Sequence, residues 1–258
     1  MSNKILSGPQ APETNLDQPL YTPIKRRSFF MYAGATAGAT ALVLAGCKKD
    51  DNNNPGLVSV GTGDAGVLNY AYALEQLEAD FYTQVRSGSY YTSLGTSSPE
   101  RLILDDLYYH EVIHRDFLKA AITAAGATPI KALTTVYPSG TFSSRASVLG
   151  TAKAFEDLGV AAYNGAGQYI SDPGYLFLAG KIVSVEARHA AIIRDLLSEN
   201  SFVGNDIVTL TSAGSSSLST NNGPSGSSLE RSMTPSEVVA IANTFLADGS
   251  KIDVSGIR

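Results

Sequence analysis

Cysteine and tryptophan are scarce in this chain of 258 residues, which has one cysteine, Cys47, and no tryptophan. A single cysteine excludes a disulfide within the chain and leaves no set of thiolates for a metal site. Histidine is also rare, with three residues in total. Metal binding or acid–base chemistry would therefore have to rely on carboxylates and a few imidazoles.

A long apolar run is missing as well. The Ala- and Gly-rich run at positions 31–45 has about 15 residues, whereas a helix that spans a bilayer needs about 20. It follows Lys25-Arg26-Arg27-Ser28-Phe29-Phe30 and ends in Leu44-Ala45-Gly46-Cys47. A basic start, a short apolar middle and a small-residue end predict an export signal. An uncleaved anchor helix is the alternative interpretation.

Two details of this leader resemble known export motifs. The paired arginines before Ser28-Phe29-Phe30 resemble a twin-arginine signal, the route that carries folded proteins. The Leu44-Ala45-Gly46-Cys47 motif resembles the lipobox of bacterial lipoproteins. The resemblance implies a signal over residues 1–46, lipidation of Cys47 and a position in the bacterial cell envelope, on the periplasmic side. Residues 47–66 are then expected to form a flexible tether.

Positive charge is the third deficit. The chain has 19 basic and 24 acidic residues, and removal of the leader, with four basic and two acidic residues, leaves 15 and 22, a net charge of −7. Such a surface does not favour nucleic acid or an anionic membrane face. Contact with a membrane is therefore expected through the lipid only, and no nucleic acid is expected as a partner.

Four long helices are predicted from hydrophobic periodicity and capping residues, at about 64–86, 99–125, 144–169 and 173–198. Between the second and third, Pro129, Pro138 and Gly140 exclude a long helix, and an extended chain of this length can cross a whole bundle. Only a short turn separates the third and fourth helices, which must be antiparallel neighbours. Residues 201–258 read as a Ser/Gly-rich extension, with a short strand or extended segment at 206–211 and a short helix at about 235–246.

The second helix carries Glu111 and His114 on the same face as Leu104, Leu107 and Leu118. Buried ionisable groups cost several kcal/mol unless something pairs with them. The fourth helix repeats the pattern with Glu186 and His189 among apolar residues. Two copies of Glu-x-x-His on inward faces require a common explanation.

The first and third helices each add an inward glutamate, Glu75 and Glu156, and each glutamate has a tyrosine seven residues later, Tyr82 and Tyr163. One glutamate from each of two helices and Glu-x-x-His from each of the other two form the ligand set of di-iron and di-manganese bundles. The chain therefore looks like one helix pair used twice around a two-metal site.

Residues 67–200 resemble a ferritin-like domain, and the stretch from Leu68 to Tyr82 is most similar to plant desiccation-related proteins and exported bacterial relatives. The resemblance implies an all-α, ferritin-like four-helix bundle with one long crossover between helices 2 and 3 and a short C-terminal helix. It also implies that Glu111 and Glu186 bridge two metals. The lipobox and the Ser-rich loop depart from true ferritins, which argues against iron storage. The implied metal ligands are Glu75, Glu111, His114, Glu156, Glu186 and His189.

The chemistry of this set favours two Fe or Mn ions. Four carboxylates and two divalent cations neutralise one another, and oxygen and imidazole donors suit Fe or Mn. Six side chains leave coordination positions for dioxygen, peroxide or water, so ferroxidase, peroxidase or catalase-like chemistry is expected. A non-catalytic envelope protein for stress protection or partner binding, with the metal absent or structural, is the alternative. The oligomeric state stays open, with a dimer as one candidate.

Several residues near the set keep more than one interpretation. Glu78, one turn after Glu75, is an alternative or additional ligand. His110 is expected to lie beside a ligand or at the surface. Tyr82 and Tyr163 are either plain core residues or residues that serve the site, through a hydrogen bond to a ligand carboxylate or through a redox role. We expect Asp116 and Asp157 to be solvated.

Overall fold

The computed structural model describes residues 56–204, 206–208 and 229–258, and these residues are mostly helical. The predicted all-α class is confirmed. The expected signal and Cys47 lie outside the described residues. Within the described ranges no helix is long and apolar enough to cross a membrane. The long helices are α2 (Gly63–Ser87), α4 (Pro99–Ala124), α5 (Arg145–Ala166) and α6 (Pro173–Leu197). The short elements are β1 (Val58–Ser59), α3 (Ser89–Ser93), η1 (Gly167–Tyr169), α7 (Pro235–Ala242), η2 (Asn243–Phe245) and β2 (Ile252–Asp253).

The helix starts follow their capping residues. Asp172 accepts hydrogen bonds from the first backbone N–H groups of α6, whose first residue is Pro173. At the start of α5 the side chains of Ser144 and Ser147 cap each other's backbone N–H, and Thr234 and Glu237 do the same for α7. The sequence signals and the helix starts therefore agree to within a residue or two.

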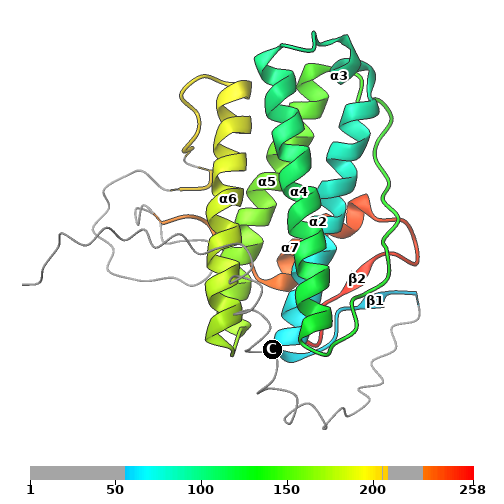
Figure 1. The fold of residues 1–258 in the computed structure, drawn as a ribbon, viewed down its shortest axis with the longest axis vertical. Helices are drawn as coiled ribbons and strands as arrows, with labels where there is room; N and C mark the ends of the chain where they lie inside the picture. The colour runs from blue at the N-terminus through cyan, green and yellow to red at the C-terminus, as the bar shows by residue number, and fades with distance from the viewer. Residues whose placement is uncertain (1–55, 205, 209–228) are drawn as a thin grey trace, which may run out of the picture. The chain divides into compact units, whose positions relative to one another are not determined.

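The four long helices form two packed pairs. Helix α2 lies along α4, and α5 lies along α6, with a short connection inside each pair (Figure 1). Phe81 of α2 and Phe155 of α5 are buried in the shared core, with ring centroids 5.1 Å apart in an edge-to-face arrangement. The pairs therefore meet through α2 and α5, while α4 and α6 are in less extensive contact.

The connection from α4 to α5 runs along α2 and spans most of its length (Figure 1). Polar side chains on one face of α2 bind it. Their partners follow in the same order along both segments, so the connection is parallel to α2. The hydrogen-bonded pairs are Asn69 with Ile130 at 2.9 Å, Gln76 with Leu133 at 2.9 Å and Asp80 with Tyr137 at 3.1 Å.

Part of the expected tether belongs to the folded body instead. In β1, Val58 pairs with Ile252 of β2 in a parallel register, and Val60 is 1% exposed. Both valines are in the main core cluster. Two apolar residues around one serine are too short a pattern to predict a strand, so this contact could not be predicted from the sequence. The first part of the expected tether, residues 47–55, lies outside the described residues.

Helix α3 lies between the first two predicted long helices, in a segment where no helix was predicted. It is one turn long, and Tyr91 anchors it by burying its ring and donating a hydrogen bond to Asp105 at 2.6 Å. After α6, residues 206–208 form a turn, and Val208 makes an isolated bridge with Glu230 in place of a regular strand. Local turns of this length carry no periodic signal in the sequence.

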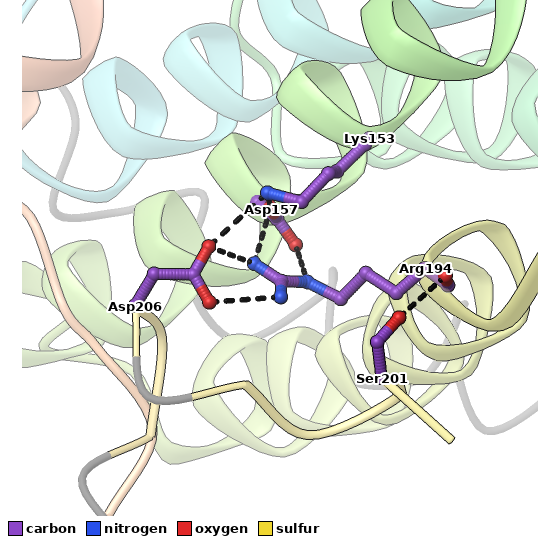
Figure 2. A network of polar contacts seen from close by, with 5 residues as sticks. All are labelled: Lys153, Asp157, Arg194, Ser201 and Asp206. Carbon is purple, nitrogen blue, oxygen red and sulfur yellow. Dashed lines mark hydrogen bonds and ion pairs between the residues drawn. The ribbon is translucent and has the colours of Figure 1, made fainter. Parts of the chain in front are cut away.

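Asp157 is buried, so our expectation that it is solvated was wrong. Its carboxylate accepts two hydrogen bonds from Arg194 of α6, both at 2.7 Å, and one from Lys153 at 3.0 Å (Figure 2). Asp206 binds the other side of the same guanidinium at 2.8 and 2.9 Å. The partner lies on another helix, which a one-helix pattern cannot reveal. Asp116 is 61% exposed, as expected.

Candidate metal centre

The four long helices bring the six predicted ligand residues together inside the bundle. Each of the four carboxylates is fully buried. The donor atoms form two groups, and within each group they lie within 4.8 Å of one another. Glu111 and Glu186 belong to both groups. The first group adds Glu75 and His114, and the second adds Glu156 and His189.

The two groups have nearly the same internal geometry. The Nδ1 atom of His114 lies 2.7 Å from Glu186 Oε1 and 3.5 Å from an oxygen of Glu75. The Nδ1 atom of His189 lies 2.7 Å from Glu111 Oε1 and 3.4 Å from Glu156 Oε2. Each imidazole thus faces one carboxylate shared by both groups and one carboxylate of its own group.

The inward donor atoms have no hydrogen-bond partners. Although the imidazole nitrogens lie at ion-pair distance from carboxylates, the angles do not meet hydrogen-bond geometry. A buried polar atom without a partner costs about 1–3 kcal/mol, so this many in one place calls for a bound species. The donor set therefore fits two cations. Among the described residues, the unpartnered atoms here are Glu75 Oε2, both oxygens of Glu111, His114 Nδ1, Glu156 Oε2, both oxygens of Glu186 and His189 Nδ1.

Comparison with known families agrees with this geometry. Residues 63–199 match the model of a ferritin-like domain. The chain belongs to the ferritin-like domain family. No curated protein matches the chain. The matched residues contain all four long helices and all six inward ligand candidates of this ferritin-like bundle.

Two tyrosines orient the carboxylates that are not shared. Tyr82 of α2 donates a hydrogen bond to Glu156 Oε1 of α5 at 2.5 Å. The same contact occurs in the opposite direction, because Tyr163 of α5 donates a hydrogen bond to Glu75 Oε1 of α2 at 2.5 Å. In each glutamate one oxygen is thus held by a tyrosine and the other faces the donor group. Both tyrosines are therefore hydrogen-bond donors to ligand candidates, the second of the two interpretations that the sequence left open.

His110 lies beside the centre and outside both donor groups. Its Nδ1 atom is 2.9 Å from His189 Nε2, and the two rings stack with centroids 5.1 Å apart. It therefore contacts the outer nitrogen of His189, whose inner nitrogen faces the carboxylates. Such a contact fixes the orientation of the inner imidazole.

Glu78 is buried next to the centre but belongs to neither donor group, whereas Glu75 belongs to the first. The geometry therefore favours Glu75 as the ligand from the first helix. Gly159 provides the space for Glu78, because a Cβ atom at that position would lie 3.0 Å from Glu78 Oε1 and 3.6 Å from Glu186 Oε2. The site wall thus contains a fifth carboxylate, opposite a residue with no side chain.

In the metal-free centre, protons bound to the imidazoles balance part of the negative charge of the carboxylates. Burial acts to lower the pKa of His114, but the adjacent carboxylates of Glu111, Glu186 and Glu75, which favour the protonated imidazole, raise it to about 12. Burial acts to raise the pKa of Glu186, and the two histidines lower it to about 2. Burial raises the pKa of Glu78 and Glu111. Cations that bind here must therefore displace protons from the imidazoles.

Proposed function

We propose that this ferritin-like protein binds two Fe or Mn ions in its bundle and performs metal-centred redox chemistry on dioxygen or peroxide. The observation that carries the proposal is the convergence of eight buried, unpartnered donor atoms on two adjacent positions. Four buried carboxylates with two imidazoles suit Fe or Mn by donor type. Glu111 and Glu186, which belong to both donor groups, would help to hold both ions.

The ions would supply the electrons of the reaction. Bound Fe(II) would supply the two electrons that, with two protons, convert dioxygen to hydrogen peroxide, and bound Mn would suit disproportionation of peroxide to water and dioxygen. The protein itself would orient the ligands and exclude water. Glu75 and Glu156 are held by tyrosine hydroxyl groups, and the four carboxylates are buried, so bulk water does not reach them.

We also propose that the protein works in the bacterial cell envelope, held there by a lipid on Cys47. The support is the twin-arginine pattern of residues 25–30 and the lipobox at 44–47. An export route that carries folded protein would allow the metal to be acquired in the cytoplasm. Growth with labelled palmitate tests this, because label should appear in the wild type and disappear in Cys47→Ser.

Elemental analysis tests the centre. Protein exported by its own signal should contain about two Fe or Mn per chain, because the two donor groups define two positions. A Glu111→Ala, Glu186→Ala double variant should lose both ions, since each removed residue belongs to both groups. The matched control is Asp116→Ala, Glu199→Ala, which removes one exposed acid from α4 and one that lies just after α6.

Assays with dioxygen and hydrogen peroxide follow from the metal result. Metal-dependent consumption of either, absent in the double variant, would support redox chemistry. A folded helical wild type that contains no metal would overturn the proposed centre. A metal-loaded protein that consumes neither oxidant would leave a non-catalytic bundle, the alternative that the sequence also allows.

A further inference from the structure

A small apolar cavity lies inside the bundle one helical turn from the metal centre. Its volume is ≈ 30 Å³. All four long helices contribute to its wall. Ala71 precedes Glu75 by four residues, Leu118 follows His114 by four, and Ile182 precedes Glu186 by four. One turn of helix is about 5.4 Å, so the cavity borders the ligand layer directly. Tyr163 belongs to both, because it lines the cavity and binds Glu75.

The wall of the cavity does not suit water. The lining side chains are aliphatic or aromatic, and their polar atoms are tyrosine hydroxyl groups. The hydroxyl of Tyr163 is engaged by Glu75, and that of Tyr70 has no hydrogen-bond partner. A buried water usually has about two to four polar partners, and cavities with an apolar lining stay dry and take up xenon or benzene. A small apolar molecule is the better match.

The cavity has the size and the access that such a molecule needs. A cavity volume of about 10–15 Å³ holds one water molecule. The volume of this cavity, ≈ 30 Å³, therefore suits a molecule of two atoms. Its lining residues on α2 and α5 are buried, whereas Phe117 and Ala121 of α4 and Leu178 and Ala179 of α6 are half-buried. The side of the cavity nearer to solvent is therefore the side formed by α4 and α6, which pack less extensively than α2 and α5.

We propose that this cavity is a binding site for dioxygen, which it holds next to the metal centre. Its role in catalysis rests on the proposed function, but its affinity for an apolar gas does not. Dioxygen is small and apolar and partitions into dry cavities, whereas hydrogen peroxide is polar and does not. The cavity would therefore favour dioxygen over peroxide as the oxidant.

Xenon tests the cavity without any metal. Xenon-129 NMR and crystals under xenon pressure should show one xenon atom among Ala71, Leu118 and Ile182 in metal-free protein. Ala179→Leu should abolish xenon binding by filling the cavity, and Leu178→Ala should increase it by enlarging the cavity. Ala187→Leu, the same change at an exposed position of α6, should leave it unchanged. An ordered water in the cavity with no xenon would overturn the proposal.

Oxidation kinetics test the role of the cavity. In protein loaded with Fe(II), Ala179→Leu should slow oxidation by dioxygen at least tenfold and leave oxidation by hydrogen peroxide unchanged. Ala187→Leu should slow neither. A variant that binds no xenon yet reacts with dioxygen at the wild-type rate would overturn the role. Metal content measured on the same samples tests the proposed function separately, because loss of metal does not remove the xenon site.

Discussion

At the scale of single residues, the centre depends on how each carboxylate is divided between two tasks. Glu75 and Glu156 each give one oxygen to a tyrosine and keep the other for the donor group. A tyrosine hydroxyl fixes the rotation of the carboxylate, which otherwise would have to be ordered at the moment of metal binding. The tyrosines would therefore contribute to the affinity of the proposed metal centre without being ligands.

Tyr163→Phe should weaken metal binding by roughly 10–100-fold and lower stability by about 1–3 kcal/mol, because Glu75 Oε1 loses its donor. Competition with a chelator measures the affinity, and urea unfolding measures the stability. Tyr137→Phe is the control, since it removes a hydrogen bond to Asp80 on the outer side of α2. Equal losses of metal affinity in the two variants would argue against an orienting role.

The titration of His114 should be visible in the stability of the metal-free protein. Its unfolded pKa is about 6.5 and the carboxylates of Glu75, Glu111 and Glu186 raise the folded pKa to about 12. A raised pKa means that its contribution to stability is complete below about pH 6.5 and is lost as the pH rises toward 12. We therefore expect the urea midpoint of metal-free protein to fall between pH 6.5 and pH 9.

His114→Asn should reduce this fall. His110→Asn should not, because burial lowers the pKa of His110 and its linkage has the opposite sign. With metal bound, the imidazole of His114 is unprotonated in the folded state, so stability should instead rise up to about pH 6.5 and then stay level. A fall of the same size in wild type and His114→Asn would contradict the assignment.

The sequence predicted the six inward residues because each occupies a polar position in an apolar stripe, a signal that one helix displays by itself. Contacts between helices carry no such signal. The two histidines are 79 positions apart in the His110–His189 contact, and the partner of Asp157 is on another helix. The pairing of each tyrosine with the glutamate of the opposite helix was likewise not deducible from spacing.

At the scale of elements, helix boundaries were predictable because they depend on local capping chemistry. The connection between α4 and α5 was predictable as non-helical but not in its path. Its path is set by polar side chains such as Asn69 and Gln76, which lie on the outer face of α2 and bind extended backbone. A hydrogen bond of this kind satisfies backbone groups that a buried loop would otherwise leave unpaired.

The network around Arg194 joins α5, α6 and the turn at Asp206 (Figure 2). Arg194→Met should destabilise the fold by about 3 kcal/mol, because it leaves the buried carboxylate of Asp157 with only Lys153. Loss of one partner of a buried ion pair costs about 3–5 kcal/mol. The lower value applies here because Asp206, the other partner of Arg194, is more than half exposed. Urea unfolding measures the loss, and limited proteolysis after α6 should quicken.

A double variant separates charge from packing in this network. Arg194→Met, Asp157→Leu should recover most of the stability, because no uncompensated charge stays buried. Lys251→Ala, which breaks the exposed pair with Asp248, should leave the urea midpoint nearly unchanged. If the double variant were as unstable as Arg194→Met, packing rather than charge would explain the loss.

At the scale of the whole molecule, the bundle is one helix pair used twice, with two departures from the repeat. Glu75 and Tyr82 correspond to Glu156 and Tyr163 at a constant offset, and Glu78 then corresponds to Gly159. When Glu111 of α4 is aligned with Glu186 of α6, His110 corresponds to the apolar Val185. These departures make the surroundings of the two donor groups chemically unequal although the groups themselves match in residue type.

Metal should stabilise the whole bundle, because it binds the folded state and neutralises buried carboxylates. At a metal concentration about 1,000 times the Kd, the gain is about 4 kcal/mol, which for a chain of this size raises Tm by roughly 8–16 °C. Thermal unfolding with and without chelator measures it. The Glu111→Ala, Glu186→Ala variant should show no shift on addition of metal, and an unchanged Tm in metal-loaded wild type would contradict a buried site.

The parallel pairing of β1 with β2 also sets the order in which the molecule can be made. The N–H of Val58 bonds to the carbonyl of Lys251 at 2.7 Å, so the first strand of the described fold pairs with the last. Val58 emerges from the ribosome long before Lys251, because the helices of the bundle lie between them in the sequence. The two strands can therefore pair only after the helices between them have been synthesised, so β1 must wait unpaired while the bundle emerges.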